Sequence, residues 1–206
     1  MSQGDEDFAD RLAAATPTPG GGAAAARVGL IATSLLRMSV GLTLKKPAAD
    51  GSSDTLRAVD SEAKELADLF RRLESADVAA FDGFMAALRL PRTNDAEREL
   101  RREELRTATE VATQVPLDTL RGCLRLVELA RQLLVDRDSL DLAAPSDAQA
   151  AAELARGAFL TAEHNVDANL PYLGKERAER ARRTRRELRQ SLNEQYEGIA
   201  DEGLTD

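Results

Sequence analysis

Asp77 is the residue whose position most favours acid–base chemistry. It follows Leu73 by four residues and precedes Phe81 by four, so it falls on the apolar face of a predicted helix. A carboxylate there must be paired, hydrogen-bonded or protonated, because desolvation disfavours its charge. A raised pKa would suit a general acid or base working near neutral pH. Periodicity alone supports equally a structural salt bridge to a neighbouring helix.

A second candidate is the glycine-rich loop over residues 16–22, which runs directly into the alanines at 23–26. Its prolines at 17 and 19 favour an extended approach, and its three glycines can adopt unusual backbone angles and expose N–H groups. The loop therefore predicts a binding site for an electron-rich group at a helix N-terminus, formed by Pro19, Gly20, Gly21 and Gly22. Taken alone, it is better explained as a sharp turn between two closely packed helices.

Polar residues of one long predicted helix form the third set. Ser146 is its expected N-cap, and Asp147 lies in its first turn, where a negative charge is favoured. Asn165 and Asn169 are four residues apart and predict a polar contact, or else a helix end in solvent. Because Asp147 and Asn165 are about 27 Å apart along a straight helix, they cannot serve one site within it.

Residues typical of metal or disulfide chemistry are scarce. His164 is the only histidine and is expected on the surface, so we predict no metal site. Cys123 is the only cysteine; it is expected to pack in the core, and no internal disulfide can form. A reducing cytoplasm is therefore the expected location. The arginine-rich segment after residue 175 is interleaved with glutamates and lacks aromatic partners, which indicates a solvated helix face.

Composition narrows the class of protein. The 206 residues carry a net charge of −8, which argues against general nucleic-acid binding. The N-terminus is acidic, unlike a signal peptide, and no stretch is expected to span a membrane. Aromatic residues make up only 3% of the chain, so the core must be built from Leu, Ala and Val. This composition suits closely packed helices.

The elements that position these residues are all predicted to be helices. We expect an all-α fold, a single multi-helix bundle of about six to seven helices, forming one domain over residues 1–206. The expected helices cover residues 5–15, 23–44, 54–90, 95–114, 116–134, 146–170 and 175–200. Asp54 is the expected N-cap of the longest helix, and Pro116 is expected in the first turn of another.

Apolar spacing predicts which helix faces form the core. In the helix over 23–44, the expected apolar face comprises Val28, Ile31, Leu35, Met38 and Leu42. Small residues elsewhere on that helix would let another helix or a flat ligand approach closely. In the helix over 54–90, the apolar face comprises Val59, Leu66, Phe70, Leu73, Phe81, Phe84 and Leu88.

Taken together, several segments resemble the cyclodeaminase/cyclohydrolase family, which processes folates. The matching segments lie in family order between about residues 8 and 173. They are Phe8 with the loop 16–22, Leu42-Thr43 with Lys45-Lys46, Asp77 with Ala80-Phe81 and Met85, Leu90-Pro91-Arg92, Val115-Pro116-Leu117, Leu126 with Glu128-Leu129-Ala130, Ser146-Asp147-Ala148, and Asn165-Val166 with Asn169.

The resemblance implies an all-helical, usually dimeric enzyme acting on tetrahydrofolate that carries a one-carbon unit, without a metal or other cofactor. It implies that the glycine loop lines the folate pocket and that Lys45 or Lys46 meets the acidic glutamyl tail or supports the site. It also implies Asp147 as the leading catalytic acid or base, with Asp77 and Asn165 as polar site residues. The reaction would be methenyltetrahydrofolate cyclohydrolysis or formimidoyltetrahydrofolate cyclodeamination.

The sequence departs from the family pattern at several positions. Leu44 and Gln149 stand where the family usually has glycine, and Leu140-Asp141-Leu142-Ala143 replaces a segment rich in asparagine. These departures motivate an alternative function, a diverged and non-catalytic dimeric module that binds a ligand or partner. A further alternative is a helical scaffold whose charged last helix binds a partner.

Overall fold

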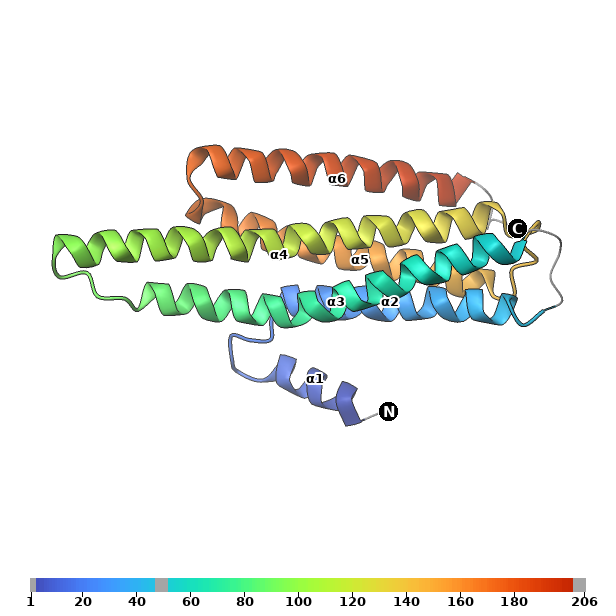
Figure 1. Ribbon diagram of the computed structural model, residues 1–206, viewed down its shortest axis with the longest axis horizontal. Coiled ribbons are helices and arrows are strands. Elements are labelled where there is room, and N and C mark those ends of the chain that lie inside the picture. The colour runs from blue at the N-terminus through green and yellow to red at the C-terminus, as the bar shows by residue number, and fades with distance from the viewer. Residues whose placement is uncertain (1–2, 47–51, 202–206) are drawn as a thin grey trace.

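A computed structural model describes residues 3–46 and 52–201, which form six α-helices and one 3-10 turn (Figure 1). No strand occurs within those two ranges, so the all-α prediction is confirmed. The elements are α1 Gln3–Ala13, α2 Gly21–Thr43, α3 Ser52–Leu88, α4 Asp95–Val135, α5 Pro145–Asn169, the 3-10 turn η1 Leu170–Tyr172, and α6 Lys175–Asp201.

Helices α2 to α5 form an antiparallel four-helix bundle. In it α2 packs on α3 and α5, and α4 packs on the same two helices from the other side. Helix α6 lies outside and packs on α4 and α5 (Figure 1). The paired ends of α3 and α4 project beyond the N-terminus of α2 and the C-terminus of α5 (Figure 1). The short helix α1 contacts α2 through Phe8, whose ring centroid lies 4.5 Å from the Arg27 guanidinium carbon.

The buried face of α2 consists mainly of small residues, together with Leu36 and Val40. This corrects the predicted apolar face, of which only Val28 and Leu35 pack, partly buried, against the core. Ile31, Met38 and Leu42 are 50%, 46% and 41% exposed, whereas positions such as Gly29, Ala32 and Ser39 are buried. Close packing explains why this face is buried, because a Cβ at Gly29 would lie 2.5 Å from the Phe70 ring. Small residues let α2 approach its neighbours closely enough for backbone and ring to touch, as close-packed interiors require.

Helix α4 is continuous through Pro116, which corrects the prediction of two helices over 95–114 and 116–134. At 41 residues it is also longer than α3, which has 37. Its N-cap is Asn94, whose side chain accepts a hydrogen bond from the Glu97 N–H at 2.9 Å.

Two other predicted N-caps lie inside their helices. Asp54 is in the first turn of α3, and Ser146 follows Pro145 in the first turn of α5, where Ala144 occupies the N-cap position. The start of α5 at Pro145 follows from the preference of proline for the first helical position.

The apolar length of α2 also corrects an expectation. Residues Gly21–Thr43 are long and apolar enough, by length and composition, to cross a membrane. Half of the most apolar window is buried against the rest of the bundle, as in a core helix.

Candidate functional site

Asp77 lies against the first turn of α2. Its Oδ2 accepts a hydrogen bond from the backbone N–H of Ala23 at 2.8 Å. A Cβ at Gly22 would lie 2.0 Å from Asp77 Oδ1, so glycine is required there for the carboxylate to approach. The sequence predicted that an electron-rich group binds at this helix N-terminus. The chain's own Asp77 carboxylate occupies part of that position.

The environment of Asp77 shifts the protonation equilibrium of its carboxyl. Burial raises the pKa of the Asp77 carboxyl, and the hydrogen bond from Ala23 lowers it by a smaller amount. No cationic side chain is recorded as a partner of Asp77, so the salt-bridge interpretation finds no support among the described residues. A half-buried carboxyl with a raised pKa can hold or release a proton closer to neutrality than an ordinary aspartate.

Asp77 lines a cavity of about 400 Å³ between the start of α2, the C-terminal part of α3 and the end of α5. We call this the Asp77 cavity. The size suits a flat small molecule or part of one. Its lining combines the glycine loop with polar and aromatic side chains: Pro17, Thr18, Gly20, Gly21, Gly22, Asp77, Ala80, Phe81, Phe84, Ala112, Asn165, Ala168, Asn169 and Tyr172.

The glycine loop reaches this cavity with ordinary backbone angles. Gly20 is the N-cap of α2 in an extended conformation, with φ −120° and ψ −159°, and no glycine from 20 to 22 has a left-handed φ. The expectation of unusual glycine angles was wrong; the glycines are needed for close approach. Pro19 follows a cis peptide bond and is not itself among the lining residues, although its neighbours Thr18 and Gly20 are.

The two asparagines of α5 have different partners. Asn165 donates through Nδ2 to the Thr161 carbonyl oxygen at 3.0 Å, which leaves its Oδ1 to accept from a ligand. Asn169 donates through Nδ2 to the Ala112 carbonyl oxygen of α4 at 2.7 Å. Both line the Asp77 cavity, so the structure brings them together with the loop and Asp77.

The remaining predicted site residues lie at the other end of the bundle. Lys46 Nζ lies 3.0 Å from Asp141 Oδ1, and Lys45 precedes it on the surface. Asp147 and Ser146 lie in the first turn of α5, the end opposite to Asn169. None of these four lines the Asp77 cavity. Within one chain, the structure therefore separates Asp147 from Asn165, as the helix length predicted, and Asp147 does not line the cavity that contains Asp77.

Aromatic side chains are the site residues that sequence reasoning missed. Phe81 and Phe84 were predicted as core but are only partly buried, and they line the cavity with Tyr172. The Phe84 and Tyr172 rings meet edge to face, with centroids 5.4 Å apart. The chain has only five Phe and two Tyr. Because aromatic residues are so scarce, their positions in the sequence could have been considered as candidates for a ligand site.

Other candidates have the predicted surroundings. His164 is exposed, and Cys123 is completely buried in the core, where burial raises the pKa of its thiol. Within residues 3–46 and 52–201, no group of three His, Cys, Asp or Glu side chains is arranged to hold a metal ion.

Comparison with known proteins identifies the family. The family model described as formiminotransferase-cyclodeaminase matches residues 5–190. The chain belongs to this formiminotransferase-cyclodeaminase family. The family match covers the glycine loop, every lining residue of the Asp77 cavity and Asp147.

Individual members of the formiminotransferase-cyclodeaminase family align over most of the chain. A methenyltetrahydrofolate cyclohydrolase of Methylorubrum extorquens is 34% identical over 165 residues, which are 80% of this chain and 77% of that protein. A formimidoyltransferase-cyclodeaminase of Rattus norvegicus is 28% identical over 79% of this chain but only 30% of its own length.

A solved structure has the same fold. The crystal structure of a formiminotetrahydrofolate cyclodeaminase from Thermotoga maritima superposes with a TM-score of 0.83, covering 98% of this chain and 95% of that one. The two chains are 24% identical, so this likeness shows the fold alone.

Proposed function

We propose that this protein is an enzyme of folate one-carbon metabolism that acts on a tetrahydrofolate derivative. The observation that carries the proposal is Asp77, a half-buried carboxyl with a raised pKa in a cavity lined by aromatic rings and two asparagine side chains. Family membership and the 34% identical relative named as a methenyltetrahydrofolate cyclohydrolase supply the substrate class.

The cyclohydrolase reaction needs one group that moves a proton. Water adds to the methenyl carbon, one C–N bond opens, and 10-formyltetrahydrofolate and a proton are released. Asp77 as carboxylate takes the proton from water as the C–O bond forms and returns it to the ring nitrogen as the C–N bond breaks. Phe81, Phe84 and Tyr172 would hold the flat rings, which fixes the methenyl carbon near this carboxylate.

Cyclodeamination uses the same groups in a related sequence. N10 attacks the formimidoyl carbon, the departing nitrogen takes up the proton released from N10 and a second proton from an acid, and ammonia leaves to give the methenyl compound. Asp77 would donate the second proton, and the raised pKa suits this role. Both reactions require no cofactor in this proposal. We favour the cyclohydrolase because the higher sequence identity is to a protein with that name.

Four predicted site residues lie at the far end of the bundle: Lys45, Lys46, Ser146 and Asp147. They could contribute to the Asp77 cavity only if it is the cavity of a second copy of the chain. The C-terminal half of α2 contacts the loop before α5: Ser39 Oγ donates to the Ala144 carbonyl oxygen at 2.8 Å, and the Ala143 N–H donates to Thr43 Oγ1 at 3.0 Å. Helix α2 is about 34 Å long and spans both ends. An antiparallel homodimer through α2 would place Lys45, Lys46, Ser146 and Asp147 of one copy beside the Asp77 cavity of the other.

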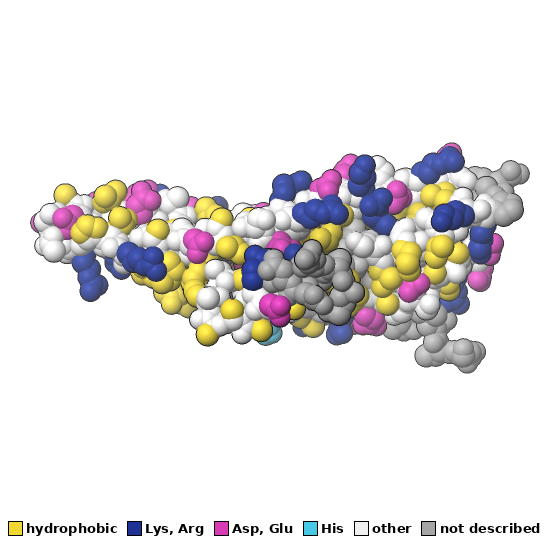
Figure 2. Space-filling view, turned by 90° about the horizontal axis from the view of Figure 1, so that it is seen from below, with side chains coloured by type: hydrophobic (Ala, Val, Ile, Leu, Met, Phe, Trp, Pro, Cys, Tyr) yellow, Lys and Arg dark blue, Asp and Glu magenta, His cyan; other side chains and the backbone are white. Residues whose placement is uncertain are grey.

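The exposed apolar side chains of α2 support such a homodimer. Ile31, Met38 and Leu42 lie on one side of the helix and are between 41% and 50% exposed. Hydrophobic side chains gather on this side of the molecule to the right of α1 (Figure 2). We also place the enzyme in the cytoplasm, without a nucleic-acid or membrane partner, in keeping with its single buried cysteine and net charge of −8.

An absorbance assay tests the function. We expect the purified protein to accelerate loss of the 5,10-methenyltetrahydrofolate chromophore above the spontaneous rate, and Asp77→Asn to remove that acceleration. If the methenyl substrate is not consumed, formimidoyltetrahydrofolate with ammonia detection tests the cyclodeaminase. If both substrates are inert, the diverged binding module becomes the better interpretation.

A further inference from the structure

A cation of α2 connects the short helix α1 to the helix that carries Asp77. The Arg27 guanidinium carbon lies 4.5 Å from the centroid of the Phe8 ring, and Arg27 Nη2 donates to Glu74 Oε1 of α3 at 2.7 Å. A guanidinium can make both contacts at once, because its flat face stacks on a ring while its edge donates hydrogen bonds. Arg27 therefore links α1, α2 and α3 at one point.

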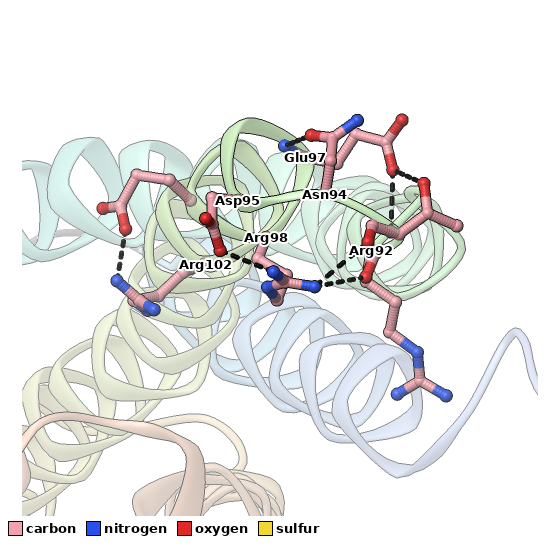
Figure 3. A network of polar contacts seen from close by, with 8 residues as sticks. Arg92, Asn94, Asp95, Glu97, Arg98 and Arg102 are labelled. Carbon is pink, nitrogen blue, oxygen red and sulfur yellow. Dashed lines mark hydrogen bonds and ion pairs between the residues drawn. The ribbon is translucent and has the colours of Figure 1, made fainter.

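The Arg27–Glu74 ion pair differs from those at the projecting ends of α3 and α4. There Arg98 pairs with Asp95 of the same helix, and the two side chains are 50% and 99% exposed (Figure 3). Exposed pairs of this kind contribute little to stability. The Arg27 and Glu74 side chains are only 24% and 18% exposed, and they join two helices. Because a partly buried pair is screened less by solvent, it can hold the two helices in register.

This ion pair lies one helical turn from the contact that places Asp77. Ala23 precedes Arg27 by four residues on α2, and Asp77 follows Glu74 by three on α3, so each of these pairs shares a helix face. The Ala23 N–H donates to Asp77 Oδ2 at 2.8 Å. The two contacts are neighbouring bridges between the same two helices. The ion pair thereby fixes the helix spacing at which the backbone hydrogen bond to Asp77 can form.

Phe8 holds the segment that forms one wall of the Asp77 cavity. Phe8 is buried, whereas residues 9–17 are exposed, so its ring is the buried contact of α1 and the loop that follows. Pro17 and Thr18, at the end of that loop, line the cavity. The position of this wall therefore depends on the packing of Phe8 against Arg27.

We propose that Arg27 is a positioning residue for the Asp77 cavity. Through Glu74 it holds the first turn of α2 against Asp77, and through Phe8 it holds the loop wall of the cavity. This inference rests on the proposed function, and it adds a residue that is not among those lining the cavity. Arg27 acts on the reaction by fixing the places of groups that meet the substrate.

The first test replaces Arg27 by methionine, which keeps an unbranched apolar stem and removes both contacts. Because a displacement of about 1 Å in a catalytic site can cost about 100-fold in rate, we expect kcat/KM for 5,10-methenyltetrahydrofolate to fall by about 10–100-fold. Glu74→Gln keeps the shape of the partner and should cause part of the same loss. Arg27→Lys keeps a charge toward Glu74 without the flat stacking on Phe8, so it should restore part of the activity.

Arg37→Met is the matched control. Arg37 Nε lies 2.8 Å from Asp60 Oδ1, in an ion pair that also joins α2 and α3, and both side chains are 36% exposed. Neither residue lines the Asp77 cavity. This variant loses an interhelical ion pair of the same kind, and its kcat/KM should change by less than about twofold. Equal losses in Arg37→Met and Arg27→Met would indicate general loosening of the bundle and overturn the inference.

Phe8→Ala tests the connection to the loop. We expect it to raise KM and to reduce kcat less than Arg27→Met does, because the ring supports the cavity wall and not the first turn of α2. Since Phe8 acts through Arg27 in this proposal, Phe8→Ala/Arg27→Met should be no less active than Arg27→Met alone. Fully additive losses would contradict that coupling and overturn the inference.

The pH profile separates positioning from a merely structural role. The hydrogen bond from Ala23 lowers the pKa of Asp77, and the charge of Arg27 is not among the causes that shift it. If the first turn of α2 moves away in Arg27→Met, this hydrogen bond weakens and the pKa of Asp77 rises. The limb of the pH–rate profile that reports Asp77 should then move to higher pH in Arg27→Met and stay in place in Arg37→Met. A limb at the same pH in both variants would overturn the inference.

Hydrogen exchange distinguishes failure of this inference from failure of the proposed function, because it needs no substrate. We expect the amides of Thr18, Ala23 and Ala24 to exchange faster in Arg27→Met than in the unaltered protein, with no change in Arg37→Met. That difference, without turnover by the unaltered protein, would retain Arg27 as the support of the cavity and remove the enzymatic proposal. Turnover with equal exchange in the two variants would do the reverse. Neither turnover nor a difference in exchange would overturn both.

Discussion

Asn169 Nδ2 lies 2.7 Å from the carbonyl oxygen of Ala112, across the contact between α5 and α4. Ala112 is four residues before Pro116, and proline has no N–H, so this carbonyl lacks its usual helical donor. The asparagine amide supplies the missing hydrogen bond. It thereby allows α4 to continue through a proline, and it fixes the end of α5 beside the Asp77 cavity.

Asn169→Ala should therefore destabilise the protein through Pro116. Loss of the donor leaves a partly buried carbonyl unsatisfied, at a cost of about 1–3 kcal/mol. In a Pro116→Ala background the restored N–H satisfies Ala112, and the same substitution should cost under about 1 kcal/mol. Urea unfolding of the four proteins in this cycle measures the coupling. Equal costs in both backgrounds would contradict the assignment.

Asp77→Asn should separate activity from stability. The amide oxygen can still accept from the Ala23 N–H, but it cannot transfer a proton, so we expect kcat to fall by about 10²–10⁴-fold. The melting temperature at neutral pH should stay equal or rise, because a desolvated charge is removed. A large fall in melting temperature would indicate that Asp77 is structural.

The same residue predicts a pH dependence of stability. Burial raises the pKa of Asp77 in the folded state above its unfolded value of about 3.9. Between these two pKa values, the folded protein therefore binds more protons than the unfolded protein. The free energy of unfolding should then fall as pH rises from the unfolded pKa through the folded one. Asp77→Asn should flatten this part of the curve. Unfolding measured at steps from pH 3 to 8 in both proteins checks the sign.

Gly22→Ala should disturb the site by a clash. Its Cβ would lie 2.0 Å from Asp77 Oδ1, so the carboxylate or the first turn of α2 must move, at about 1–3 kcal/mol. Activity should fall with it. Gly41→Ala in the same helix is the matched control, because its Cβ would meet nothing within 4 Å and alanine favours a helix. Equal effects of the two substitutions would show that close approach at Gly22 is not required.

The sequence predicted the fold class because turn residues and long apolar periodicity are local signals. Family resemblance, which carries information on distant contacts, assigned the glycine loop, Asp77 and the two asparagines to one site. It assigned Asp147, Ser146 and the two lysines to the same site, but these do not line the Asp77 cavity within one chain. Counting large apolar residues failed for α2, where Gly29 and Ala32 are buried and Met38 is exposed. Small residues are favoured on that face of α2 because the Phe70 ring of α3 packs against Gly29, a contact between residues far apart in the sequence.

Pro116 and the cavity aromatics show the same limit. Proline predicts a helix start unless a distant donor satisfies the carbonyl it leaves, and Asn169 is that donor. Phe81 and Phe84 fit the apolar periodicity of α3, but they line the cavity beside the start of α2 and the end of α5. Neither relationship can be derived from residues close in sequence.

The exposed face of α2 predicts the assembly. Met38→Glu and Ile31→Glu should convert a homodimer to a monomer in light scattering, because a buried unpaired carboxylate at the interface is costly. Val111→Glu, which alters a side chain of α4 that is also 50% exposed, should leave the mass unchanged.

If Asp147 of one copy serves the Asp77 cavity of the other, the monomeric variants should also lose activity while keeping their helical content. Mixing Asp77→Asn with Asp147→Asn should then restore part of the activity that each variant lacks, since some mixed dimers contain one intact shared site. A monomeric unaltered protein, or full activity in the monomeric variants, would contradict a shared site and leave the Asp77 cavity as the catalytic centre of a single chain.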